Sequence, residues 1–184
     1  MASRPGRTNP FAVFPLHKRR LEALRDELQR RGDRPSLNLP TARLDLVEAM
    51  SVVEEYGPLC EAMYLMMAAD RKVLNVERMV LRGALDVLSK GRIRTAHMES
   101  MIDASSKRVA ELGEAGCLAE CIDALKSDPI RAEITVVLAA AVAAADNHIS
   151  PEERDLYHKL IEGLGISDER ADSLLTDLLK PDSD

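Results

Sequence analysis

The stretch AAADNHISPEERDLYHKLI (residues 143–161) repeats, without a gap, the pattern of MAADRKVLNVERMVLRGAL (residues 67–85). In each copy an apolar run ends in Asp, a short loop follows, and a Glu-Arg pair opens a segment whose apolar residues recur at helical spacing. A pattern that occurs twice at matched positions indicates a duplicated helical unit whose two halves pack together.

The remainder of the chain also has the pattern of helices. From Thr41 onward no run alternates with a period of two, and Gly or Pro separates segments of helical periodicity. LCEAMYLMMAA (59–69) and ITVVLAAAVAAA (134–145) are apolar nearly all round, which is typical of helices at the centre of a bundle. The predicted helices span about 15–31, 41–54, 58–69, 75–89, 95–112, 116–126, 129–145, 151–164 and 168–179. The sequence thus predicts an all-α fold, a compact bundle of about seven to eight helices with an internal two-fold repeat, plus an N-terminal helical arm.

Charge divides the chain into two parts. Residues 1–43 carry ten Lys/Arg and four Asp/Glu, whereas the rest carries 15 Lys/Arg and 27 Asp/Glu. We therefore expect a basic N-terminal arm with one helix at 1–40 and an all-helical domain at 41–180.

The arm has two interpretations. Phe11 and Phe14, the only Phe residues, either anchor the arm to its own body or form a docking motif for another protein. The positive charge could attract nucleic acid, anionic lipid or an acidic protein, and it could equally fold back onto the acidic body of its own or a neighbouring subunit. Because few rings are present to stack on bases, we expect a protein partner or self-association rather than nucleic acid. The candidate partner-binding residues are Phe11, Phe14, Lys18, Arg19 and Arg20.

Several classes of protein are not expected. The N-terminus lacks the apolar core of a signal peptide, and the longest apolar run, 134–145, is too short to span a bilayer. Three Cys residues without framework spacing suggest a reducing compartment, so we expect a cytoplasmic protein. Cys60, Cys117 and Cys121 are expected to be buried small hydrophobic residues. No nucleophile elbow, phosphate loop, dinucleotide fingerprint or zinc motif occurs, and we expect no catalysis.

The loop of the second copy contains a helix start. Ser150 is in the N-cap position, Pro151 in the first helical position and Glu153 in the third, which together predict a capping box. Asn147 follows the preceding helix and is expected in the left-handed conformation. Local structure thus accounts for these residues without a ligand.

Asp146 is not explained by capping, because the dipole at the C-terminal end of a helix disfavours an anion. The same holds for Asp70. Either loop N–H groups and the matched Arg78 and Arg154 compensate the carboxylates, or a cation does. Hard oxygen ligands would suit calcium or magnesium, and zinc is expected less because it would need the imidazole of His148. The candidate metal ligands are Asp146, Glu153, His148, Asp70 and Glu77.

The two loops resemble those of the TerB-like family, in which the pattern is Asp-Gly-x-Ile/Val-Ser/Asp-x-x-Glu. ADNHISPEER, followed by EGLGIS, is the closer match; in ADRKVLNVER, Arg71 stands in place of the Gly and Leu74 in place of the capping Ser or Asp. The resemblance covers residues 45–180 approximately and implies a compact all-α bundle. It also implies a tellurite-resistance-related or wider chemical-stress system, with divalent cations bound by the acidic loop residues.

Two functional hypotheses follow. In the first, the chain is a non-catalytic TerB-like protein of a metal or chemical-stress system that binds a divalent cation through the Asp146 loop. In the second, it is a helical scaffold or adaptor whose loops are structural and whose basic arm recruits a protein partner. Similar domains occur in membrane-anchored DnaJ-like co-chaperones, so the resemblance leaves a peripheral contact with a membrane complex open, although the J-domain His-Pro-Asp is absent.

Overall fold

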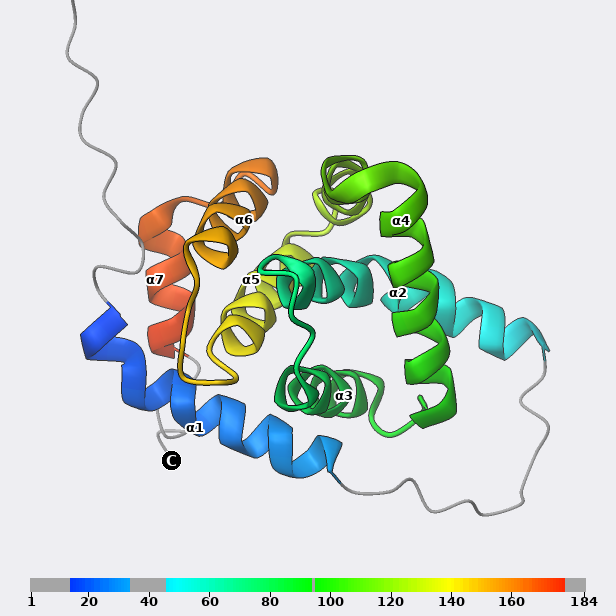
Figure 1. Cartoon of the computed structure of the whole chain (residues 1–184), viewed down its shortest axis with the longest axis horizontal. Helices are drawn as coiled ribbons and strands as arrows, with labels where there is room; N and C mark the ends of the chain where they lie inside the picture. The colour runs from blue at the N-terminus through cyan, green and yellow to red at the C-terminus, as the bar shows by residue number, and fades with distance from the viewer. Residues whose placement is uncertain (1–13, 34–45, 94, 178–184) are drawn as a thin grey trace, which may run out of the picture.

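The computed structural model describes residues 14–33, 46–93 and 95–177, and every regular element in these ranges is an α-helix (Figure 1). The seven helices are α1 (Phe14–Gly32), α2 (Leu46–Ala68), α3 (Asn75–Ser89), α4 (Thr95–Leu125), α5 (Pro129–Ala143), α6 (Pro151–Gly163) and α7 (Asp168–Asp177). The predicted all-α bundle is confirmed. None of these described helices has the length and apolar character needed to cross a membrane.

α5 lies at the centre and contacts each of the other helices in the described structure (Figure 1). Residues 136–145 are all buried, so the second half of this helix and the two residues after it have no face turned to water. Many of them are Ala, whose small side chain lets a neighbouring helix approach closely. The central position predicted for 134–145 is therefore confirmed.

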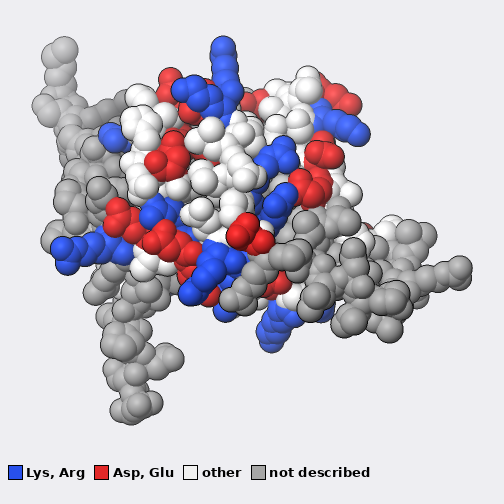
Figure 2. All heavy atoms as spheres, turned by 60° about the horizontal axis from the view of Figure 1, so that its bottom comes forward, with Lys and Arg blue, Asp and Glu red and all other residues white. Residues whose placement is uncertain are grey.

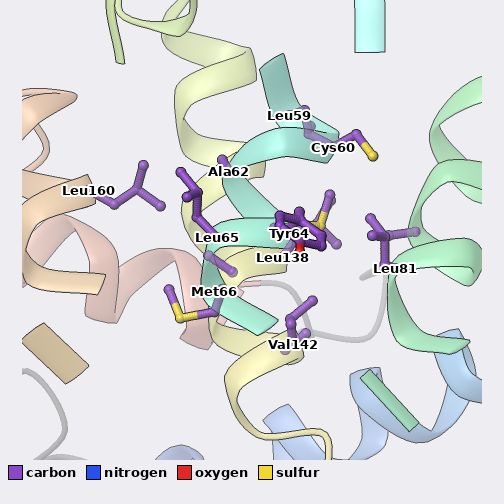
Figure 3. Packing of buried hydrophobic residues seen from close by; sticks show 14 of the residues in the cluster. Leu59, Cys60, Ala62, Tyr64, Leu65, Met66, Leu81, Leu138, Val142 and Leu160 are labelled. Atoms are coloured by element: carbon purple, nitrogen blue, oxygen red, sulfur yellow. The ribbon is translucent and has the colours of Figure 1, made fainter. Parts of the chain in front are cut away.

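The second half of α2 forms the other part of the core. Residues 59–67 are buried, and they belong to one cluster with the buried faces of α3, α5 and α6. In Figure 3, Leu160 of α6 points toward Leu65 of α2. From the opposite side, Leu81 of α3 points toward Tyr64. The two most apolar segments of the sequence thus pack against each other, as expected for a duplicated unit.

α2 corrects one predicted boundary. Separate helices were expected at 41–54 and 58–69, but a single helix continues through Pro58. An interior Pro removes one backbone hydrogen bond and crowds the preceding turn, and here the extensive burial of the following turns outweighs that cost. Arg131 Nη1 donates a hydrogen bond to the carbonyl of Glu55 at 3.2 Å, close to the turn in which Pro58 has no N–H to donate. The first residues of the predicted 41–54 helix lie outside the described part.

α4 changes direction where the sequence predicts a break. Gly113 has φ 77° and ψ 162°, values that are not helical and that favour Gly because it lacks a Cβ. The two segments on either side correspond to the predicted helices 95–112 and 116–126.

The basic helix α1 packs against α3 at very short range. The backbone carbonyl of Leu28 occupies the position next to Gly83 where a Cβ would lie, and the carbonyl of Met79 does the same at Gly32. The order of these two contacts makes the helices antiparallel. α1 is therefore held on the helical body, while the domain boundary predicted at residues 40/41 lies outside the described residues.

We predict that Gly83→Ala lowers the free energy of unfolding by about 2–3 kcal/mol, because the new methyl group would collide with the backbone of α1. The matched control is Gly57→Ala in α2, where a Cβ has nothing within 4 Å. There the better helix propensity of Ala should stabilise the protein by roughly 0.5–1 kcal/mol. Chemical denaturation measures both; equal effects of the two substitutions would contradict the close α1–α3 contact.

Candidate functional site

The two repeated loops have the same backbone structure. Arg71 has φ 64° and Asn147 has φ 65°, so in both loops the residue directly after the Asp is in the left-handed region. Asp70 Oδ1 accepts a hydrogen bond from the N–H of Lys72 at 2.8 Å, and Asp146 Oδ1 accepts one from His148 N–H, also at 2.8 Å. The left-handed conformation predicted for Asn147 is confirmed. Loop N–H groups thus provide part of the compensation that each Asp requires.

The following helices also begin in the same way. Glu77 Oε2 accepts from the N–H of Leu74 at 2.7 Å, and Glu153 Oε2 accepts from Ser150 N–H at 2.6 Å. In the second loop Ser150 Oγ additionally accepts from Glu153 N–H at 3.1 Å, which completes the predicted capping box. Leu74 has no acceptor to offer, so α3 has only one half of this arrangement.

The fold brings the carboxylates of the two loops together. Glu77 and Glu153 are each only 4% exposed. Burial, opposed by the hydrogen bond from the N–H of Leu74 and assisted by the negative charges of Glu153, Asp70 and Asp146, raises the pKa of Glu77 to about 7. The pKa of Glu153 is raised as well, first by burial and then by Asp70 and Asp146. The site therefore holds four carboxyl groups close together, two of them largely shielded from solvent.

The predicted counter-charge of the first loop is wrong. Arg78 forms its ion pair with Glu99 of α4, at 3.1 Å between Nη1 and Oε2, rather than with Asp70. Arg82, one turn further along α3, also pairs with Glu99. In α3, therefore, Glu77 of the shared Glu-Arg pair caps the helix, whereas Arg78, together with Arg82, attaches α4 to it.

Arg25 of α1 approaches the second loop, which the sequence analysis missed. Its side chain is largely buried, and Nη1 donates to the carbonyl of Ala144 at 3.3 Å and to Oδ1 of Asn147. This places a positive charge at the C-terminal end of α5, where the helix dipole favours a cation. The available signal was the position of Arg25 on the apolar stripe of its helix, between Leu21 and Leu28.

The candidate ligands do not form a group that fits a metal ion. Among the described residues, no three His, Cys, Asp or Glu side chains are placed so that they could hold one ion. Each of the four loop carboxylates already accepts a backbone N–H of its own loop. Ligation would compete with these hydrogen bonds, so the donor set suits capping better than coordination.

A polar cleft of about 690 Å³ lies on the outer side of the loops. Asp70 and His148 face it, whereas Asp146, Glu77 and Glu153 are not among its lining residues. Its wall carries both signs of charge: Arg71 and Lys72 come from the first loop, and Glu114 of α4 and Glu152 and Asp155 of α6 are acidic. The structure thus separates the predicted metal ligands: Glu77 and Glu153 are buried capping residues, Asp70 and His148 line the cleft, and Asp146 is exposed outside it.

The predicted partner-binding residues lie at the start of α1. Arg19 is exposed. Phe11 lies outside the described residues, and the side chains of Phe14, Lys18 and Arg20 also lie outside those described.

A second polar cluster lies between α2 and α4. Glu61 is buried, pairs with Arg108 at 2.8 Å and accepts a hydrogen bond from the Cys121 thiol at 3.5 Å. Burial and the charge of Glu61 raise the pKa of Cys121, and burial raises the pKa of Cys60 to about 12. The thiols are therefore protonated at neutral pH and are poor nucleophiles. The burial predicted for Cys60, Cys117 and Cys121 is confirmed.

Comparison of the chain with models of protein families, with curated proteins and with solved structures gave no match. The TerB-like resemblance therefore stays a prediction from the loop motif.

We predict that stability rises as the pH falls through neutrality. The pKa of Glu77 is about 7 in the folded protein and 4.5 in the reference state, so the folded protein takes up the proton first. The stability that protonation of Glu77 contributes is fully present below pH 4.5 and is lost as the pH rises through about 7. Glu77→Gln keeps an oxygen that can cap α3 and removes the charge, so it should stabilise the protein at pH 8 by on the order of 1 kcal/mol.

The test is chemical denaturation at several pH values between 5 and 8. Glu152→Gln makes the same charge change at an exposed position of α6 and serves as the control. An identical pH dependence in wild type and Glu77→Gln would contradict the prediction.

Proposed function

We propose that the protein is a non-catalytic helical adaptor that recruits a protein partner through its basic N-terminal region. The observation that supports this most is the distribution of charge along α1. Residues 19–33 carry five Arg and four Asp/Glu, so this part of the arm is close to neutral. Most of the excess positive charge of the arm comes from residues that flank it, which are Arg4, Arg7, Lys18, Arg34 and Arg43.

Three of the described Arg residues of α1, namely Arg25, Arg30 and Arg31, form ion pairs with acidic residues of the same helix. Arg30 and Arg31 both pair with Glu27, and Arg31 lies 4.0 Å from Asp86 of α3. Figure 2 turns the α1 side of the molecule toward the viewer and shows basic and acidic side chains interleaved over it. A partner attracted by positive charge would therefore meet it at the ends of this helix rather than along its length.

A fixed α1 suits recruitment. Because its backbone lies against that of α3 and Arg25 is bound to the second loop, the start of the helix is presented in a fixed position. Binding then costs less conformational entropy than it would for an unanchored segment. The partner surface that fits is acidic with an apolar component, which Phe11 and Phe14 would contact.

We predict that Lys18→Glu, Arg19→Glu and Arg20→Glu together abolish capture of the partner, because they reverse the charge at the start of α1. The control is Arg71→Glu, Lys72→Glu and Lys107→Glu, the same charge change on exposed residues of the body. Affinity capture followed by quantitative mass spectrometry identifies proteins retained by wild type and control. Retention of the same proteins by the arm variant would reject the arm as the recruiting element.

Cation binding at the second loop is the alternative candidate. What favours it is the mutual repulsion of the loop carboxylates, which a divalent cation would relieve. The place of the protein in a tellurite-resistance-related or chemical-stress system rests on the resemblance of the loop motif. The equivalent backbone geometry of the two loops supports treating them as two copies of that motif.

On this alternative, millimolar calcium or magnesium raises the melting temperature of the wild type, because the ion binds only the folded loop. Zinc tests the contribution of His148. Asp146→Asn with Glu153→Gln should remove the shift. Unchanged melting with all three ions would exclude the alternative, and a shift that persists in the double variant would place the ion elsewhere.

A further inference from the structure

An apolar groove of about 450 Å³ runs between α1, α3, α5 and α7. Leu24 of α1, Val87 of α3, Ile130 of α5 and Leu174 of α7 each contribute to its wall. Ile130 is 72% exposed and Val87 is 44% exposed, although both are large apolar residues. Apolar surface of this kind, concentrated in a groove, is typical of a docking site.

The groove offers no free charge to a ligand. Among the described residues that line it, Glu133 is the only charged one, and it forms a two-pronged ion pair with Arg170 at 2.7 and 2.8 Å. This pairing lowers the pKa of Glu133. An occupant must therefore be apolar where it enters the groove.

We propose that the occupant is the C-terminal segment of the chain itself, residues 178–184, which inserts Leu178 and Leu179 into the groove. The described part of α7 ends at Asp177, beside α1 (Figure 1). Leu178 directly follows Asp177 and comes four residues after Leu174, a wall residue of the groove, so at most about 14 Å of chain separates the two. The remaining residues of the segment are of types that are usually exposed to solvent: Lys180, Pro181, Asp182, Ser183 and Asp184.

The N-terminal segment is a weaker fit. Phe14 precedes Leu24 by ten residues, about 15 Å along α1. Phe11 lies three residues further back, and three residues of extended chain span only about 10 Å. Residues 1–10 contain no Leu, Ile, Val or Phe. Neither Phe11 nor the residues before it combine the reach and the side chains that the groove requires.

The test uses methyl-labelled full-length protein and nuclear Overhauser spectra. We expect cross-peaks between the methyl groups of Leu178 or Leu179 and those of Leu24, Val87 or Ile130. Leu178→Asp with Leu179→Asp should remove these cross-peaks, shift the groove methyl resonances and increase the fluorescence of an added apolar dye. A variant that lacks residues 181–184 keeps both Leu residues and should leave all three signals unchanged.

Leu178→Ala with Leu179→Ala repeats the test with a milder change, and dispersed amide spectra show that each variant is folded. Absence of cross-peaks from Leu178 and Leu179 to the groove in the full chain would overturn the proposal. Groove resonances that shift on dilution would also overturn it, because they would show a second copy of the chain in the groove.

Discussion

The structure depends on the burial of the second half of α5, residues 136–143. This half has no polar face and cannot lie at the surface, so every side of it must be covered by another element. α2 covers it with its own apolar second half, and the remaining helices complete the shell. α1 takes part in this shell, which explains why a helix rich in Arg and Glu is held so tightly against α3. The basic region of the chain is thus connected to the core by packing and not only by charge.

Burial of both central helices also determines the chemistry of the loops. A helix that ends in the interior leaves carbonyl groups without partners, and the next helix leaves N–H groups without partners. The same solution occurs twice: a left-handed residue, an Asp that accepts a loop N–H, and a Glu that caps the next helix. Because the two units pack face to face, their carboxylates come close and repel one another. This cluster resembles a metal site by composition, but its oxygen atoms are used by the backbone.

The differences between the two loops are informative. Asn147 can adopt the left-handed conformation at low cost and its side chain accepts from Arg25, whereas the equivalent residue of the first loop is Arg71, which adopts this conformation at a higher cost. Ser150 completes a capping box that Leu74 cannot form. Only the second loop is therefore tied to α1. The two copies share one framework, and single-residue differences connect the second copy to α1.

The sequence by itself determined the helical class, the two central helices, the breaks at Gly113 and in the loops, and the capping residues of α6. These depend on short-range periodicity and on backbone conformations that few residues adopt, and both can be read locally. It did not determine that α2 continues through Pro58, because that depends on burial of the helix among others. Nor did it show that Arg78 pairs with Glu99 or that Arg25 reaches Asn147, since those partners lie far apart in the chain. Only the tertiary structure decides which charges meet, because the distance between two side chains in space has no simple relation to their separation in sequence.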